Sequence, residues 1–302
     1  MALGMDLRSL RFFLAVAREK SFMGAAEVLH HTQPNITRTI KALEEELGGA
    51  LFIRSVRGVT LTPKGESLFN RATEITDLFD QTQRELSRPE KEIGVTGDVH
   101  LAAGETVHMD KIAAVMACVR EECPGIRFHV HSANGEEVAR RVDLGLCDLG
   151  LVFESFNVTP YAHRRLPWNE KWGVLVRDDH PLAGKAGIAP EDLRRQHLIV
   201  SSQMWENREF EGWYGYGVNR LDVVASYNLV TSGRQMMKAG IGVLLTFEGL
   251  AGSNEGVRFI PLTPSLQAAP YLIRKRGAPV APPVRVFLDA LNSHISPTLS
   301  SG

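Results

Sequence analysis

The sequence predicts an α/β protein with a small, mainly helical N-terminal part and a larger C-terminal part of alternating strands and helices, joined by a long helix. Three observations predict this. Apolar residues recur at helical spacing over the first 50 residues, and the spacing continues over 68–86. Beyond residue 98, short apolar runs alternate with amphipathic stretches. A chain of 302 residues is long enough for two domains with separate cores.

The composition is that of an ordinary globular protein, with 44% apolar and 23% charged residues. No apolar run approaches the roughly 18–20 residues that span a bilayer, and the N-terminus lacks the features of a signal peptide, so we expect a cytoplasmic protein with no membrane partner. Whether translation starts at Met1 or Met5 stays open. The three cysteines fit no zinc spacing, and we expect no metal and no cofactor. They read as reduced apolar residues, with a redox pair of Cys118 and Cys123 as the alternative.

Charge is distributed unevenly along the chain. Residues 1–65 hold nine Lys and Arg against six Asp and Glu, a net charge of +3, which leaves −4 for the remainder of a chain whose total is −1. A basic head on an acidic body is typical of a protein whose contact with nucleic acid is confined to one end.

Three helices are predicted in the head, each with an N-cap candidate: Asp6, Ser21 and Thr32. The third helix tolerates Pro34 in its first turn, and Gly48-Gly49 end it. The apolar face of the first helix consists of Leu7, Leu10, Phe13, Leu14 and Ala17. The second helix has Ala25, Ala26 and Leu29, and the third has Ile36, Ile40, Leu43 and Leu47.

The outward face of the third helix carries hydrogen-bonding groups and no acid before Glu44. Its residues are Gln33, Asn35, Thr37, Arg38 and Lys41. Amides bind adenine and Arg binds guanine in bidentate fashion, whereas carboxylates repel phosphates. A helix face that is only solvated would normally carry both acidic and basic side chains. We therefore predict that this helix reads double-stranded DNA.

A β-hairpin is predicted after the third helix, over residues 51–61. Arg57-Gly58 forms its tip, which places a cation where a minor groove or a phosphate could lie. Thr62-Pro63 then begins another helix. Residues 1–65 therefore read as a winged helix-turn-helix DNA-binding domain.

These motifs resemble the LysR-type transcriptional regulators. The matching segments are LRFFLAVA from Leu10, Ser21-Phe22 with Ala25-Ala26, Thr32-Gln33-Pro34, Thr37-Arg38, KALEEEL from Lys41, Leu51-Phe52-Ile53-Arg54 and Leu61-Thr62-Pro63-Lys64-Gly65. The resemblance implies that the third helix enters the major groove and that the wing also contacts DNA. The implied contacts are Thr32, Gln33, Pro34, Thr37 and Arg38 on the helix, and Arg54 and Arg57 at the wing. His30-His31 and Asn35 depart from the family pattern.

A heptad seam follows the head, with spacings of four and three residues. Its members are Leu68, Ala72, Ile75, Phe79, Thr82 and Leu86. We interpret residues 66–92 as a linker and dimerisation helix; the alternative is a helix that lies on its own domain. The resemblance implies a homodimer or homotetramer on a promoter region with a dyad, and RNA polymerase is a candidate partner.

The alternation of strand and helix patterns over residues 98–153 predicts a parallel sheet with right-handed crossovers. A second series of strands is predicted from residue 172. Two such lobes resemble the periplasmic-binding-protein fold, which LysR-type regulators use as their effector domain. The expected boundaries are 98–302 for the effector-binding domain, 98–167 plus 265–302 for lobe one, and 168–264 for lobe two.

Ligands of such folds lie between the lobes, where strands end and helices begin. The expected effector-binding residues are Thr106, Asn134, Gly135, Ser201, Ser202, Thr246 and Phe247. Hydroxyls and free N–H groups favour a small organic acid. Glu105 or Glu136 in the cleft would oppose an anion, so the charge of the effector stays open. In the alternative interpretation, each hydroxyl only caps its helix.

Residues 203–217 contain Trp205, Phe210, Trp213, Tyr214 and Tyr216, which line a pocket, cover an oligomer interface or form a lobe core. Two rival functions fit the sequence less well. An enzyme would need a nucleophile elbow, a P-loop or a metal motif, and none is present. An exported solute-binding protein would need a signal peptide and would have no use for a DNA-reading head. We therefore predict a non-enzymatic transcription regulator of the LysR type that responds to a small-molecule effector.

Overall fold

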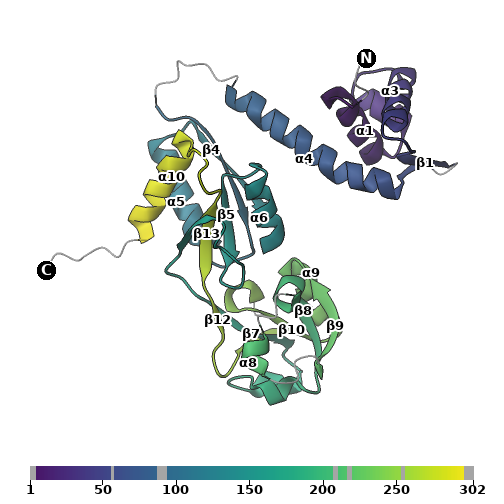
Figure 1. Cartoon of the computed structure of the whole chain (residues 1–302). Helices are drawn as coiled ribbons and strands as arrows, with labels where there is room; N and C mark the ends of the chain where they lie inside the picture. The colour runs from purple at the N-terminus through teal and green to yellow at the C-terminus, as the bar shows by residue number, and fades with distance from the viewer. Residues whose placement is uncertain are drawn as a thin grey trace. The chain divides into compact units, whose positions relative to one another are not determined.

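The computed structural model describes residues 5–55, 58–86, 94–206, 210–215, 220–252 and 256–295. The chain divides into two compact units, Met1–Glu90 and Lys91–Gly302 (Figure 1). Within the described ranges, no helix is both long and apolar enough to cross a membrane.

The N-terminal unit combines helices with a small hairpin. Its elements are α1 (Leu7–Glu19), α2 (Phe22–Val28), α3 (Gln33–Glu46), β1 (Phe52–Ser55), β2 (Gly58–Leu61) and α4 (Pro63–Leu86). The predicted caps at Asp6 and Ser21 are confirmed, since their side chains accept hydrogen bonds from the backbone N–H groups of Ser9 (2.7 Å) and Gly24 (3.2 Å). Thr32 stands at the N-cap position of α3, but its side chain makes no capping bond.

The core of this unit lies between α1, α2, α3 and the hairpin. Phe13, Ile36, Ile40 and Leu43 are fully buried, as the periodicity predicted. The buried face of α1 is wider than predicted, because Phe12 and Val16 are also buried. The extra width follows from contacts on two sides, with α2 and α3 and with α4.

Glycine is required at two positions in the backbone of this unit. Gly48 follows α3 with φ of +67°, a left-handed conformation that ends a helix and that favours glycine. Gly65 lies in the first turn of α4, where a Cβ atom would come within 2.2 Å of the Leu51 carbonyl oxygen. Glycine at position 65 therefore lets α4 pass directly over the start of the hairpin.

In the long helix α4, the predicted heptad seam is only partly exposed. Ala72 is fully buried and Leu68 is half-buried, and both pack into the core of their own unit. Ile75 and Phe79 are 44% and 41% exposed, and Thr82 is also exposed. The side chain of Leu86 lies outside the described residues. The alternative interpretation therefore holds for the first half of this helix, which lies on its own domain. An exposed apolar strip begins only at Ile75, with Leu78 (40% exposed) as a member that the prediction omitted.

Lobe one of the C-terminal unit is a sheet in the order β4-β3-β5-β13-β6. Its strands are β3 (Gly97–Ala103), β4 (Ile126–Ser132), β5 (Leu149–Phe153), β6 (Ala162–Arg165) and β13 (Pro270–Arg274). Its helices are α5 (Met109–Glu122), α6 (Gly135–Asp143) and α10 (Pro282–Ile295). The predicted parallel pairing of β3 with β4 and β5 is confirmed. Helices α5 and α10 cover one face of the sheet and α6 covers the other (Figure 1).

Lobe two is a sheet in the order β11-β7-β10-β8-β9, with β12 beside β7. Its strands are β7 (Glu170–Arg177), β8 (His197–Ser201), β9 (Asp222–Tyr227), β10 (Val243–Phe247), β11 (Val257–Pro261) and β12 (Gln267–Ala268). Its helices are η1 (Pro181–Gly184), η2 (Pro190–Leu193), α7 (Ser202–Glu206), α8 (Glu211–Tyr214), α9 (Val230–Lys238) and η4 (Glu248–Ala251). Because β12 pairs with β7, the chain leaves this lobe after Ala268, slightly later than the expected boundary at 264.

Candidate DNA-reading helix and effector cavity

The outward face of α3 is open to solvent. Thr32, Gln33, Pro34, Arg38 and Lys41 are exposed, and Asn35 and Thr37 are half-buried. The buried residues Ile36, Ile40 and Leu43 lie on one side of the helix and fix its rotation, so that the polar side chains point outward as a group. Lys41 lies 3.8 Å from Glu45, an exposed pair that holds the side chain only weakly.

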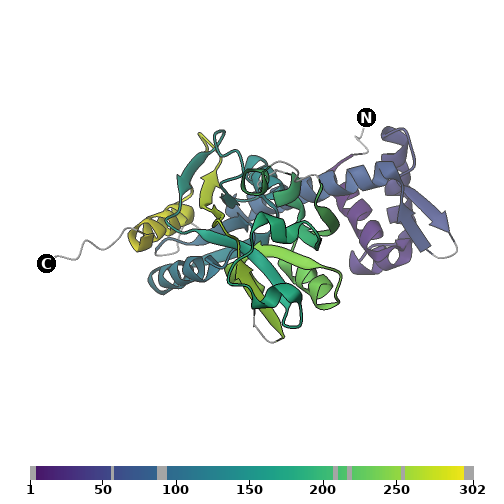
Figure 2. The same ribbon diagram turned by 90° about the horizontal axis from the view of Figure 1, so that it is seen from below.

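The hairpin forms the predicted wing beside α3. β1 and β2 pair antiparallel, with Ser55 opposite Gly58. In Figure 2 this hairpin projects from the helices of the N-terminal unit. The guanidinium of Arg54 lies 4.4 Å from the centre of the Phe22 ring, which orients this cation at the base of the wing. Arg57, the predicted tip residue, lies outside the described residues.

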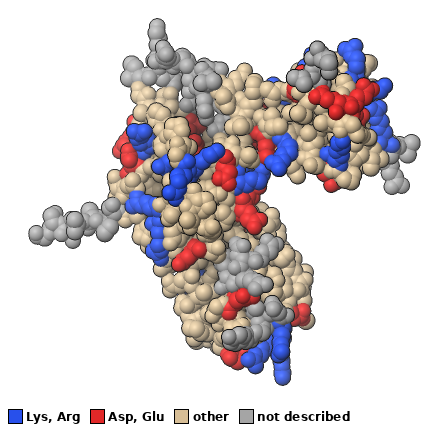
Figure 3. All heavy atoms as spheres, in the orientation of Figure 1, with Lys and Arg blue, Asp and Glu red and all other residues tan. Residues whose placement is uncertain are grey.

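Charge on the N-terminal unit is mixed. On the face shown in Figure 3, Lys and Arg side chains lie along the outer margin of this unit, next to a group of Asp and Glu side chains. The acids Glu44, Glu45 and Glu46 all belong to the last turns of α3. The part of α3 that carries exposed polar and basic side chains without an acid therefore runs from Gln33 to Lys41.

A cavity opens between the two lobes of the C-terminal unit, with about 640 Å³ of space that is continuous with solvent. The described lining residues are Gly104, Glu105, Ala133, Asn134, Phe153, Trp172, Ser201, Ser202, Gln203, Met204, Tyr227, Asn228, Val230, Thr246, Phe247 and Leu250. Five of the seven predicted effector residues are among them: Asn134, Ser201, Ser202, Thr246 and Phe247.

Thr106 and Gly135 do not line the cavity. The hydroxyl of Thr106 is buried and donates to Glu170, which also accepts from the Val107 N–H at 3.2 Å. Burial raises the pKa of the Glu170 carboxyl above its usual range. The N–H of Gly135 donates to the Gln203 side-chain oxygen at 2.8 Å. Both residues therefore join the two lobes, a role that their places in the sequence did not indicate.

Two side chains cross the cavity in opposite directions. Glu105 of lobe one accepts a 2.6 Å hydrogen bond from the N–H of Val230, the first residue of α9 in lobe two. Gln203 of lobe two accepts the bond from Gly135, the first residue of α6 in lobe one. The N-termini of α6 and α9 are thus each supplied with an oxygen from the opposite lobe, at the position that an anionic ligand would occupy.

The charge of the lining bears on the kind of effector that the cavity can take. Among the described lining residues, Glu105 is the one charged group, and no Lys or Arg is present. Burial raises the pKa of the Glu105 carboxyl, against the opposing effect of the Val230 N–H. A ligand carboxylate would therefore meet a like charge and no cation.

Aromatic rings form one part of the wall. The centre of the Phe247 ring lies 4.2 Å from that of Trp172 and 5.0 Å from that of Phe153. Thr246 is 1% exposed, and its hydroxyl makes no hydrogen bond to a described residue. A buried hydroxyl in this state costs free energy unless a ligand or water bonds to it. Of the three alternatives predicted for the aromatic residues of 203–217, the lobe core applies to those that the structure describes. Phe210 is buried in the core of lobe two, and Trp205, Trp213 and Tyr214 pack on that core. Tyr216 lies outside the described residues.

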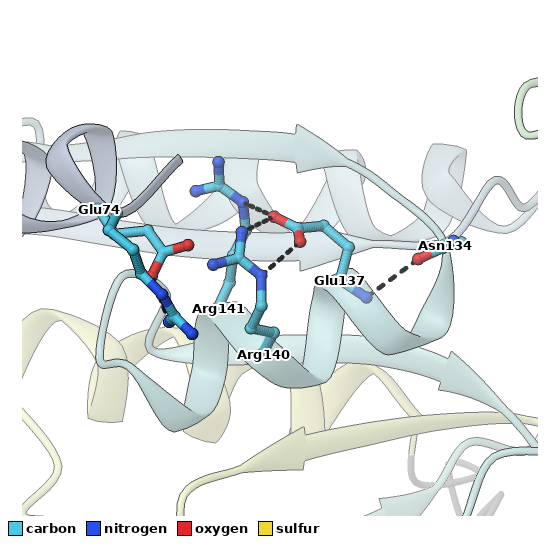
Figure 4. A network of polar contacts seen from close by, with 6 residues as sticks. Glu74, Asn134, Glu137, Arg140 and Arg141 are labelled. Carbon is cyan, nitrogen blue, oxygen red and sulfur yellow. Dashed lines mark hydrogen bonds and ion pairs between the residues drawn. The ribbon is translucent and has the colours of Figure 1, made fainter. Parts of the chain in front are cut away.

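The predicted alternative of helix capping applies to Asn134. Its side-chain oxygen accepts from the N–H of Glu137 at 3.0 Å. Glu137 in turn accepts hydrogen bonds from Arg140 (2.7 Å) and Arg141 (3.0 Å) along α6 (Figure 4). Asn134 therefore has both roles: it caps α6 and presents its remaining amide surface to the cavity.

Two family models cover most of the chain. The model described as "Bacterial regulatory helix-turn-helix protein, lysR family" matches residues 7–66, and the model described as "LysR substrate binding domain" matches residues 93–296. The chain belongs to the LysR family. It is accordingly a DNA-binding transcription regulator with an effector-binding domain, as its helix-turn-helix motif and its two lobes predicted.

Similar proteins agree with this assignment. The chain is 30% identical over 206 residues to the HTH-type transcriptional regulator CysL of Bacillus subtilis, an alignment that spans 67% of this chain and 66% of CysL. It is 26% identical to the RuBisCO operon transcriptional regulator of Allochromatium vinosum, over 94% of each chain. These LysR-family relatives are regulators and not enzymes.

Solved structures share the fold over nearly the whole chain. The full-length CbnR bound to its target DNA has a TM-score of 0.70 and 18% identity, and the comparison covers 96% of this chain and 100% of CbnR. HinK, a LysR family transcriptional regulator from Pseudomonas aeruginosa, has a TM-score of 0.57 and 22% identity, with 96% and 98% of the two chains covered.

Proposed function

We propose that this LysR-family regulator reads DNA with the wing and with α3 from its N-cap Thr32 to Lys41, and that a small molecule bound between the lobes controls it. The observation that carries the DNA-reading part is the outward face of α3, where amide, hydroxyl and cationic groups share one solvent-exposed surface. CbnR, which has this fold, is a solved complex with its target DNA. The proposed contacts are Thr32, Gln33, Pro34, Asn35, Thr37, Arg38, Lys41 and Arg54.

The proposed regulator acts as a dimer or a tetramer. The exposed strip of Ile75, Leu78 and Phe79 on α4 supports self-association, since an isolated helix rarely exposes three large apolar side chains within two turns. Two heads held apart can address half-sites separated by whole turns of the DNA. A promoter region with a dyad and RNA polymerase would then be the further partners.

The effector that the cavity fits best carries a positive charge next to an apolar group. Glu105 offers the matching negative charge, and the faces of Phe153, Trp172 and Phe247 attract cations as well as apolar groups. The hydroxyl of Thr246 is available to a polar atom of the ligand. A small primary amine with a ring or an aliphatic body meets all three requirements.

DNA reading is tested with a labelled fragment from upstream of the regulator's own gene and a scrambled fragment of equal length, at several salt concentrations. We expect fragment-selective binding with a steep salt dependence. Equal binding of both fragments, and of a genomic fragment library, would overturn the proposal that this head reads sequence.

The effector class is tested separately, by the thermal unfolding of the untagged full-length chain. The probes are amines, each matched with an acid and an alcohol of the same shape, such as benzylamine, benzoate and benzyl alcohol. We expect stabilisation by members of the amine series, and its loss in Glu105→Gln, which keeps an oxygen for Val230 but removes the charge. Stabilisation by the acids, or none by any amine, would overturn the proposed class and leave the DNA-reading proposal untouched.

A further inference from the structure

The face of the lobe-one sheet opposite α5 and α10 carries a group of metal-ligating side chains. Val99 and Leu101 of β3 pack toward α5 and α10, so strand alternation turns Asp98 and His100 to the other face. On the neighbouring strand β4, His129 lies directly opposite His100 in the parallel register. Two rigid strands therefore bring a carboxylate and two imidazoles together.

The ligand atoms of these three side chains lie close to one another. One ligand atom from each of Asp98, His100 and His129 lies within 4.8 Å of the other two. His129 Nε2 is 3.1 Å from Asp98 Oδ1, close to the separation of about 3.4 Å between two donors on one tetrahedral zinc ion. The two imidazole rings are stacked, with centres 4.5 Å apart and planes 13° from parallel.

Arg127 fixes the orientation of the carboxylate. Its Nε and one terminal nitrogen donate to the two oxygens of Asp98 at 2.8 and 3.2 Å, and the Asp98 side chain is 7% exposed. A carboxylate oxygen accepts more than one bond, so the place at Oδ1 now taken by the His129 N–H can be taken by a cation. Outer partners of this kind orient the ligands of metal sites in proteins.

We propose that Asp98, His100 and His129 bind a divalent transition-metal ion of the Zn²⁺ class. Two neutral imidazoles and one carboxylate are a donor set for Zn²⁺, Ni²⁺ or Cu²⁺, not for Mg²⁺ or Ca²⁺, which take oxygen ligands. The side chain of His129 is 51% exposed, so its ring can turn to direct a nitrogen toward the ion and leave a fourth position to water. The site belongs to lobe one alone and is separate from the effector cavity.

The test is a Zn²⁺ titration of the untagged, chelator-treated full-length chain in competition with a chromophoric chelator. We expect one Zn²⁺ per chain in the wild type. His129→Asn, His100→Asn and Asp98→Asn should each weaken binding at least roughly tenfold, the loss that removal of an outer partner alone can cause. His294→Asn is the matched control, because His294 is exposed on α10 and its ring bonds to the Ala290 carbonyl one turn earlier in the same helix.

Thermal unfolding without metal checks that each variant folds, and the visible absorption of bound Co²⁺ reports the ligand set independently of folding. A tetrahedral-type Co²⁺ spectrum that His129→Asn abolishes and His294→Asn retains would support the site. Zn²⁺ binding that is equally weak in the wild type and in all variants would overturn it. So would stoichiometric binding that His129→Asn leaves unchanged.

Discussion

Replacement of Arg38 by alanine tests the proposed DNA-reading face directly. Arg38 is exposed on α3, and the residues that bury this helix lie on its other side. The substitution therefore removes a cation and leaves the core intact, so we expect no change in the thermal unfolding of the N-terminal unit.

The expected effect on DNA binding follows from one lost contact in each head. A guanidinium that reads a base contributes about 1–3 kcal/mol, and two heads on a dyad double this to about 2–6 kcal/mol. The lower limit corresponds to a dissociation constant raised roughly 30-fold. If Arg38 reads a base, the loss is larger on the cognate fragment than on the scrambled one. If it contacts a phosphate, both fragments lose affinity alike and the salt slope falls by about 0.9 for each head.

Arg71→Ala is the matched control, because it removes the same charge from the same unit. Arg71 is on α4 and 71% exposed, and its guanidinium lies 3.5 Å from Glu74, at the outer limit of a hydrogen bond. Fluorescence anisotropy with both fragments at three salt concentrations measures the difference. If Arg38→Ala and Arg71→Ala weaken binding equally, Arg38 acts only through net charge, and the proposal that α3 reads the DNA fails.

Three further predictions concern the two units separately. Glu105→Gln should stabilise the C-terminal unit at pH 7.5 and have little effect near pH 4. Burial raises the pKa of this carboxyl in the folded state, so the folded protein loses stability as the pH rises through that folded pKa and the group becomes charged. A gain in melting temperature that does not grow with pH would contradict this. Cys147 should resist iodoacetamide in the native chain, since burial raises its pKa to about 11 and leaves about 0.1% thiolate at pH 8; mass spectrometry that finds it modified as fast as Cys118 would disprove the assignment. Phe79→Lys should weaken self-association in sedimentation experiments, as a buried Phe contributes about 1.5–3 kcal/mol; unchanged sedimentation would remove the α4 strip from the interface.

Local features of the fold could be predicted because their causes are local. The caps at Asp6 and Ser21, the end of α3 at Gly48 and the pairing of β1 with β2 each depend on residues within a few positions of one another. The alternation of strands and helices likewise predicted the parallel part of lobe one. The seam on α4 was predicted only in part, because the burial of Ala72 depends on α1, about 60 residues earlier in the chain.

The candidate sites were predictable only as far as topology places strand ends together. That rule located Asn134, Ser201 and Thr246 in the cavity. It could not show that Glu105 reaches Val230, because the pair is 125 residues apart and the bond depends on the approach of two lobes. The cluster of Asp98, His100 and His129 was missed for a similar reason: alternate residues on two strands become neighbours only once the strand register is known.

The two crossed bonds between the lobes imply a particular mode of control. If the N-termini of α6 and α9 had no hydrogen-bond partners, an anion that bridges the two would close the cleft. Here Glu105 already supplies an oxygen to α9, and Gln203 supplies one to α6. An amine that pairs with Glu105 competes with the Val230 N–H for that carboxylate, so binding weakens one of the hydrogen bonds that join the lobes, while those of Glu170 and Gln203 remain. A ligand shifts a conformational equilibrium only by its differential affinity for the two states. The lobe angle should therefore respond to the charge at position 105: Glu105→Gln, which retains the tie, should hold the unliganded arrangement and leave DNA binding insensitive to amines.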